Sequence, residues 1–172
     1  WLAERAEASR DRKGWSIKVR PGVTWHGGKP FTAADVKFTF EYYQRFPEFS
    51  PRYGHHVSDA PPFERAEIID DLTIRLFYKL PAPTFMQLPG ADLPIIPKHV
   101  WETITEPSKM TKSLPVGTGP FKLVQMVPDQ LYRLQANERY FTGRPGVDVP
   151  VSPIVKDPSA ALAPLLAAQV DS

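Results

Sequence analysis

Cysteine is absent from this chain of 172 residues. Without it the chain has no disulfide bridge, no thiolate metal site and no cysteine nucleophile. The absence fits a reducing compartment and equally a secreted bacterial protein without bridges, so it leaves the compartment open.

A long apolar run and a basic run are also missing. No stretch approaches the roughly 20 apolar residues that span a bilayer, and no charged-then-apolar leader opens the chain. We therefore expect a soluble molecule, and the abrupt ends at Trp1 and Ser172 suggest a fragment of a longer chain. The 21 basic and 19 acidic residues leave a net charge of only +2, and no basic cluster resembles a nucleic-acid surface. Nucleic acid is not an expected partner.

The residues that are present are typical of a globular protein with many short elements. Hydrophobic residues make up 42% of the chain and charged residues 23%, which allows a real core. The 20 prolines exceed the usual share of about 5% and are scattered, so they divide the chain into short strands and long loops. The length fits one domain or somewhat more than one.

Alternation of apolar and polar residues predicts the strands. It indicates a strand over residues 15–20, and hairpins over residues 66–78 and 121–136. Asp70-Asp71 and Pro128-Asp129-Gln130 supply the turn residues of the two hairpins. A further strand is expected over residues 151–155.

One long helix is predicted after Thr32, which forms a capping-box pattern with Asp35. The helix should run to about Arg45 and bury a wide aromatic stripe, which we interpret as core and not as a platform for a ligand. Shorter helices are expected over residues 85–88, 97–104 and 157–170, so the overall pattern is α+β.

Histidines are the first candidates for a metal site. The adjacent His55 and His56 lie in a proline-rich loop, and imidazole suits zinc, copper or nickel. Neighbouring side chains seldom chelate one ion together, and spacing places no third ligand, so we favour a solvated pair and predict no metal and no cofactor. His26 and His99 belong to no nucleophile motif and are predicted to be structural.

Catalytic and nucleotide-binding patterns are weak. Gly27-Gly28-Lys29 lacks the glycine spacing and the following serine or threonine of a phosphate-binding loop. Asp59 and Glu64, with His55, could be imagined as a hydrolytic group, but no catalytic residue is predicted.

Several segments match one family in the same order along the chain. They are Trp15–His26, Pro30–Val36, Ile68–Ile74, Pro94–Lys98, Gly117–Lys122, Asn137–Phe141 and Asp157–Ser159. In this order they resemble the bacterial extracellular solute-binding proteins of the peptide and nickel type (family five), the receptor subunits of ABC importers. Gly27 and Gln169 depart from the family pattern, where aspartate and glycine are usual.

The resemblance implies a periplasmic-binding-protein-like type II fold, α+β, with a small mixed sheet and flanking helices. Residues 1–15 would form the edge of the N-terminal lobe, residues 16–122 a small extra domain, and residues 123–172 an incomplete return into that lobe, with the second lobe absent. The implied protein is a monomeric, non-catalytic receptor, periplasmic or extracellular, with lipid anchoring as an option. It would close two lobes over an oligopeptide or similar small solute and deliver it to the membrane permease subunits.

The resemblance also implies which loops face the ligand cleft. The expected ligand-binding residues are Arg52, Tyr53, Gly90, Ala91, Asp92, Gly117, Thr118 and Gly119. The alternative for each is a plain surface loop. The glycine-rich bend over residues 117–120 is also expected to be the crossover out of the small domain.

Two other functions remain open at this point. One is a secreted hydrolase acting on peptides or glycans, and the other is a ligand-sensing domain of a regulator. The identity of the solute is not predicted, because the groups that select it would lie largely in the missing lobe.

Overall fold

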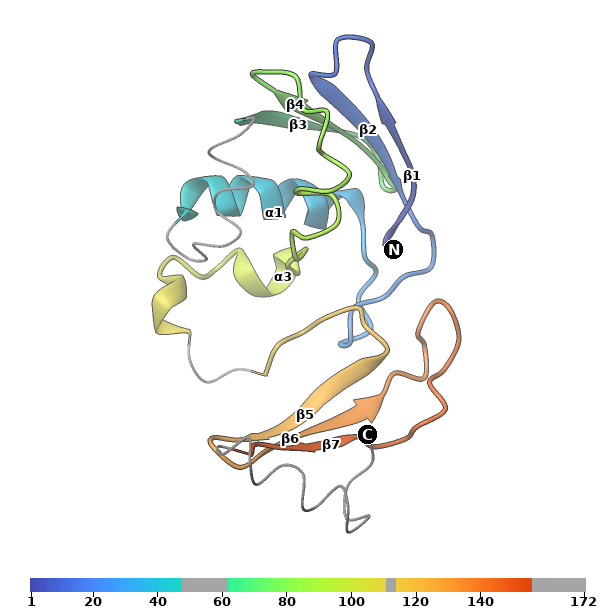
Figure 1. Cartoon of the computed structure of the whole chain (residues 1–172), viewed down its shortest axis with the longest axis vertical. Helices are drawn as coiled ribbons and strands as arrows, with labels where there is room; N and C mark the ends of the chain where they lie inside the picture. Colours follow the sequence, from blue (N-terminus) through green and yellow to red (C-terminus); the bar gives the residue numbers. More distant parts are fainter. Residues whose placement is uncertain (48–61, 111–113, 156–172) are drawn as a thin grey trace. The chain divides into compact units, whose positions relative to one another are not determined.

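The computed structural model of the chain describes residues 1–47, 62–110 and 114–155. The chain divides into two compact units, residues 1–118 and residues 119–172 (Figure 1). We refer to them as the first and the second unit. The assignment of residues 1–15, 16–122 and 123–172 to lobes stays a prediction.

A four-stranded antiparallel sheet forms one layer of the first unit. Its strands are β1 (Ala3–Ala8), β2 (Gly14–Val19), β4 (Thr73–Tyr78) and β3 (Phe63–Asp70), in that spatial order. The predicted strand after residue 14 and the hairpin around Asp70-Asp71 are confirmed, with β3 beginning at Phe63 and not at Ala66. Strand β1 was not predicted, because its sequence is polar and does not alternate.

The core of the first unit lies on one face of this sheet. Trp15, Ile17 and Val19 of β2 are buried there, and so are Ile74 and Leu76 of β4. These residues alternate with polar ones along each strand, so one face of the pleated strand becomes apolar. Burial of each such side chain contributes about 1.5–3 kcal/mol. Helix α1 covers this face (Figure 1).

Helix α1 (Ala33–Arg45) begins where the capping pattern predicts. The Thr32 main-chain N–H donates to Oδ2 of Asp35 at 3.0 Å, which satisfies an amide at the helix start. The aromatic stripe is buried, with Phe40 and Tyr43 each 3% exposed. The predicted burial of the stripe is confirmed.

Two polar side chains of α1 hold the segment before helix α3 (Lys98–Trp101). Oδ1 of Asp35 accepts the Lys98 main-chain N–H, and Oγ1 of Thr39 accepts the Ile96 main-chain N–H, both at 3.0 Å. Both side chains are buried, so these bonds are shielded from competing water. Helix α3 follows Pro97 as predicted but ends at Trp101, before residue 104.

The helix predicted over residues 85–88 does not form, and turns occupy residues 83–92. The Leu88 main-chain N–H donates a hydrogen bond to the Thr84 carbonyl, and this bond closes one helix-like turn. Pro89 has no N–H with which to continue it, so the chain bends away. This prediction was therefore wrong.

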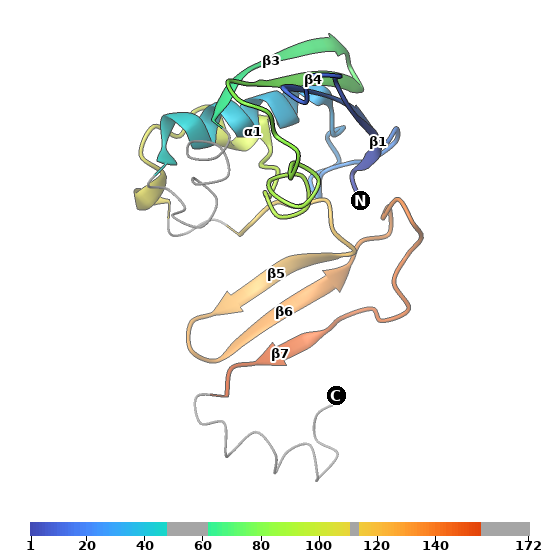
Figure 2. The same cartoon turned by 45° about the horizontal axis from the view of Figure 1, so that its top comes forward.

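The second unit contains a three-stranded antiparallel sheet (Figure 2). Strands β5 (Phe121–Val127), β6 (Leu131–Ala136) and β7 (Val151–Pro153) lie in that order, with β6 in the middle. The second predicted hairpin is confirmed, and the predicted third strand is present but shorter. The helix predicted over residues 157–170 lies outside the described residues. Within the described ranges no helix is long and apolar enough to cross a membrane.

Candidate functional site

A cavity of about 540 Å³ lies within the first unit. Strand β1 contributes Ala3 and Ala6, strand β2 contributes Ile17 and Val19, and the segment over residues 85–95 closes another side. Its remaining lining residues are Trp1, Leu2, Trp25, Phe31, Val36, Phe40, Gly117 and Thr118. The cavity is thus built from segments far apart in the sequence.

Four of the predicted ligand-binding residues line this cavity: Gly90, Ala91, Gly117 and Thr118. Asp92 follows Ala91 in the chain but is not part of the lining. Gly119 belongs to the second unit. Arg52 and Tyr53 lie outside the described residues. The structure therefore brings two separate predicted loops together, and their ligand contact stays a prediction.

The segment over residues 82–90 is held against the sheet by Trp15. The Trp15 Nε1–H donates to the Ala82 carbonyl at 3.1 Å, and its ring stacks on Phe85 with 4.8 Å between centroids. Gly90 then donates its N–H to the Phe85 carbonyl at 2.6 Å. A Cβ atom at Gly90 would lie 2.7 Å from that same oxygen. Only glycine allows this approach, so the backbone shapes the cavity wall here.

The glycine-rich bend is held by His26. The His26 main-chain N–H donates to the Gly117 carbonyl at 2.8 Å, and the Gly117 N–H donates to His26 Nδ1 at 3.2 Å. The neighbouring Trp25 is 2% exposed and packs edge-on against Phe31 and His99. The structural role predicted for the two histidines agrees with these contacts.

Two buried polar atoms of the first unit have no hydrogen-bond partner among the described residues. They are Nε1 of Trp25 and the hydroxyl of Tyr78. Burial raises the pKa of the Tyr78 hydroxyl well above its ordinary value, because the phenolate would lose its hydration. Tyr78 therefore stays neutral and cannot act as a base near neutral pH.

In the second unit, Asn137 holds the start of the first strand. Its Nδ2–H donates to the Gly119 carbonyl at 3.0 Å, and its main-chain N–H donates to the Pro120 carbonyl at 2.8 Å. The side chain is only 4% exposed. No role was predicted for Asn137, although a polar residue directly after the last apolar position of a strand can indicate one.

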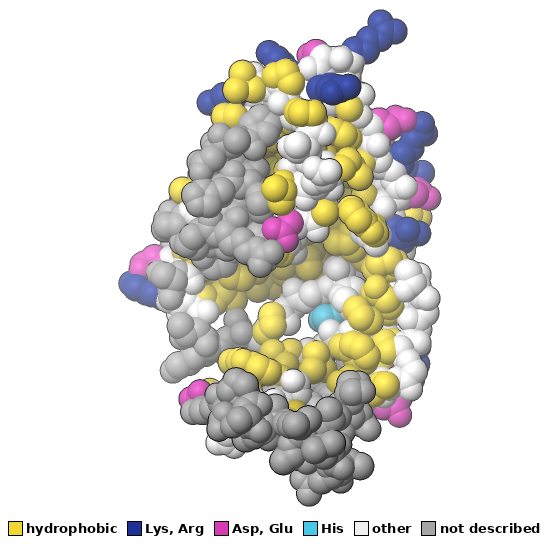
Figure 3. Space-filling model, viewed as in Figure 1, with side chains coloured by type: hydrophobic (Ala, Val, Ile, Leu, Met, Phe, Trp, Pro, Cys, Tyr) yellow, Lys and Arg dark blue, Asp and Glu magenta, His cyan; other side chains and the backbone are white. Residues whose placement is uncertain are grey.

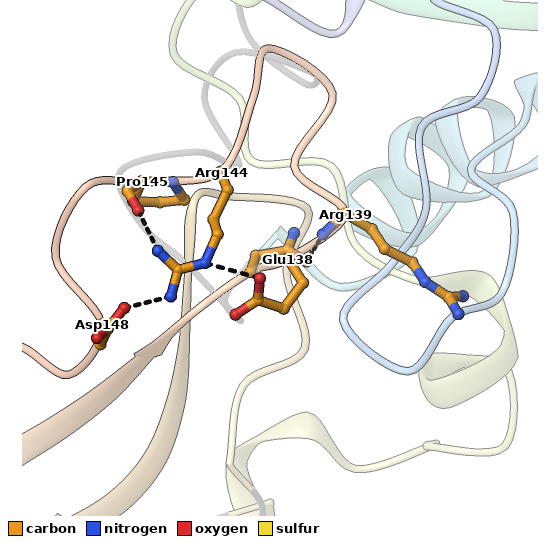
Figure 4. Close-up of polar contacts among 6 residues, drawn as sticks. Glu138, Arg139, Arg144, Pro145 and Asp148 are labelled. Atoms are coloured by element: carbon orange, nitrogen blue, oxygen red, sulfur yellow. Dashed lines mark hydrogen bonds and ion pairs between the residues drawn. The ribbon is translucent and has the colours of Figure 1, made fainter.

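Arg144 organises the loop between β6 and β7 (Figure 4). Its Nε donates to Glu138 at 2.7 Å, one terminal nitrogen donates to the Pro145 carbonyl at 2.9 Å, and the other pairs with Asp148. The hydrogen bonds that Arg144 donates to Asp148 and Glu138 raise the pKa of the guanidinium. The Arg139 side chain points away from this cluster (Figure 4). Because Arg144 already has both carboxylates as partners, the cluster is a loop clasp and offers no ligand site.

The described residues contain no group of three or more histidine, aspartate or glutamate side chains able to hold a metal ion. His55, His56 and Asp59 lie outside the described residues. Glu64, the remaining member of the imagined hydrolytic group, is an exposed residue of β3. Its Oε1 lies 3.6 Å from a terminal nitrogen of the Arg65 guanidinium, so the two form an ion pair.

The apolar lining was not recognised from the sequence. Met86 is 40% exposed and Trp1 is 70% exposed, and both contribute to the cavity. Figure 3 shows hydrophobic side chains over much of the visible face of the first unit, with lysine and arginine toward its edge. The sequence does carry one indication of this lining: apolar residues stand in the loop over residues 85–95, where they do not belong to a regular helix or strand. Exposed apolar residues of this kind can mark a binding surface.

A family model, a sequence relative and two solved structures all relate the chain to solute-binding proteins. The family model for bacterial extracellular solute-binding proteins, family 5 Middle, matches residues 1–172. A Brucella ovis protein named as an ABC transporter peptide-binding protein is 33% identical over 174 residues, which cover 98% of this chain and 32% of the relative.

Two solved structures are similar at the level of the backbone. Campylobacter jejuni NikZ in complex with Ni(L-His) has a TM-score of 0.89 and 26% identity, covering 99% of this chain and 34% of that chain. The Bacillus subtilis oligopeptide-binding protein AppA in complex with a nonapeptide has a TM-score of 0.83 and 27% identity, with the same coverage of 99% and 34%. The periplasmic-binding-protein-like fold predicted from the sequence is confirmed. The chain spans about a third of the length of the relatives that it matches.

Proposed function

The chain belongs to the family 5 bacterial extracellular solute-binding proteins, and from this premise we propose that it acts in the substrate-binding component of an ABC importer. The family match over residues 1–172 is the observation that carries the proposal. Such a component captures a small solute outside the cytoplasm and hands it to the membrane permease subunits. It changes no covalent bond, so it requires no catalytic residue.

We further propose that the solute is an oligopeptide. Two of the three relatives named above carry peptide binding in their names, whereas the third was solved with a nickel–histidine complex. Gly90 and Gly117 line an apolar cavity. Apolar walls suit a peptide whose hydrophobic side chains are buried on binding.

The proposed mechanism is closure of two lobes around the solute. The affinity then depends on contacts from both lobes and on the free-energy difference between open and closed states. Residues 16–122 would form the small extra domain, with residues 1–15 and 123–172 belonging to the N-terminal lobe. The location would be periplasmic or extracellular, with lipid anchoring as an option, and the protein would be monomeric.

Isothermal titration and thermal shift of the full-length protein test the proposal. The probes are di- to pentapeptides, mannooligosaccharides and Ni²⁺ with L-histidine. Peptides alone should raise the melting temperature, since a ligand at 100 times its Kd stabilises the folded state by about 2.7 kcal/mol. A shift with another probe and none with peptides would overturn the peptide assignment. Cleavage of a peptide, followed by mass spectrometry, would favour the hydrolase instead.

A further inference from the structure

Among the described residues, no charged side chain lines the cavity of the first unit. The polar side-chain groups of the lining are the Thr118 hydroxyl and the two indoles of Trp1 and Trp25. The indole nitrogen of Trp25 is itself buried out of reach of solvent. A charged group that entered the cavity would therefore lose hydration and find no partner of opposite charge among these described lining residues, which is unfavourable.

The cavity is also too large and too open to be an ordinary packing defect. Protein interiors contain few voids larger than a water molecule, whereas ligand sites measure roughly 300–1,000 Å³. Its volume of about 540 Å³ lies in the second range. Trp1, Met86 and Ala91 line it and are exposed, so a group can enter from solvent.

The side chains that line the cavity leave space in it for an apolar group. Ala3, Ala6 and Gly90 present little or no side chain, while Ile17, Val19 and Phe40 form a wall that is already ordered by the core. Because the walls of such a pocket are already ordered, binding of an apolar side chain costs little conformational entropy of the protein.

We propose that this cavity is a specificity subsite that takes one aromatic or aliphatic side chain of a peptide solute. The protein then selects peptides with a hydrophobic residue at one particular position and rejects aspartate, glutamate, lysine and arginine there. This inference rests on the proposed function and adds a side-chain preference to it.

The first test is isothermal titration of the full-length protein with tripeptides. Phenylalanine, leucine, glutamate or lysine is placed at each position in turn in an alanine background. At one position, phenylalanine or leucine should bind at least about tenfold more tightly than glutamate or lysine, a difference of about 1.4 kcal/mol or more. Equal affinities at every position would overturn the subsite while leaving peptide binding intact. Absence of binding by every tripeptide would contradict the oligopeptide assignment and the subsite with it.

The second test fills the cavity. Ala6 of β1 lines it and lies opposite Ile17, whereas Ala8 of the same strand is exposed, lies opposite Trp15 and is not part of the lining. Ala6→Phe should weaken binding of the preferred tripeptide about tenfold or more and leave trialanine within about threefold. Ala8→Phe is the matched control and should change neither affinity.

A third variant guards against misfolding of Ala6→Phe. Ala91 lines the cavity from an exposed position, so Ala91→Phe fills the entrance with little risk to the core. It should reproduce the selective loss for the hydrophobic tripeptide. If Ala91→Phe and a folded Ala6→Phe both keep the wild-type preference, the cavity does not receive the solute and the proposal is wrong.

Discussion

His26 and Gly117 lie 91 residues apart and exchange two hydrogen bonds. One joins their main chains at 2.8 Å, and the other runs from the Gly117 N–H to Nδ1 of the imidazole at 3.2 Å. Together they fix the last residues of the first unit beside the loop that follows β2. The bend thus gains its position from a side chain far away in sequence.

Replacing His26 by leucine should loosen this bend. The Gly117 N–H would lose its side-chain acceptor, at a cost of about 1 kcal/mol in the free energy of unfolding. Asparagine can place its Oδ1 near the position of Nδ1, so His26→Asn should recover part of the loss. Urea unfolding and amide hydrogen exchange at Gly117 measure both effects. Unchanged exchange at Gly117 in His26→Leu would contradict the role given to the imidazole.

Gly90→Ala should distort the cavity wall. Its Cβ would lie 2.7 Å from the Phe85 carbonyl oxygen, and a backbone atom cannot rotate aside as a side chain can. We expect a loss of about 1–3 kcal/mol in the free energy of unfolding, as for other overpacked sites. Gly27→Ala is the control, because a Cβ there meets no atom within 4 Å. Chemical denaturation compares the two, and equal stabilities would refute the steric argument.

Asp70 should make part of the stability dependent on pH. Its Oδ1 accepts the Leu72 N–H at 2.8 Å, and this bond and that from Thr73 lower the pKa of the carboxyl below its ordinary value of 3.8. A lowered folded-state pKa means that the contribution is complete above pH 3.8 and is lost as the pH falls through the folded-state pKa.

Asp70→Asn removes this titration. Its free energy of unfolding should fall less steeply than that of the wild type when the pH is lowered below 3.8. Urea midpoints measured across the acid range give the slopes. Asp71→Asn removes the neighbouring carboxylate and controls for the change of charge in the same turn. An unaltered slope in Asp70→Asn would show that other carboxyls dominate acid unfolding.

Arg144→Ala should free the loop between β6 and β7 with little change in overall stability. The pairs with Glu138 and Asp148 are exposed to solvent, so each contributes little to the free energy of unfolding. Amide exchange over residues 138–148 should accelerate, and high salt should accelerate it in the wild type as well, because screening weakens the ion pairs. Arg139→Ala, whose side chain points away from the cluster, should leave the exchange unchanged. A similar acceleration in both variants would indicate a general charge effect.

Local patterns along the chain predicted most of the regular structure. Trp15, Ile17 and Val19 alternate as a strand must, and Thr32 with Asp35 marks the start of α1, because a strand period and a helix cap each depend on residues only a few positions apart. The ordered family motifs also indicated the family. Strand β1 was not predicted, because its sequence does not alternate between apolar and polar residues. It is a strand because its main chain pairs with that of β2.

The site depended on contacts that no local pattern contains. The sequence alone determined that the chain is an α+β member of a solute-binding family with glycine-rich loops at residues 90 and 117. Only the tertiary structure decided that these loops meet at one apolar cavity and that His26 and Trp15 hold them there. The physical reason is that side-chain packing and hydrogen bonding across tens of residues depend on the folded backbone, whereas strand alternation and helix capping are properties of neighbours in the chain.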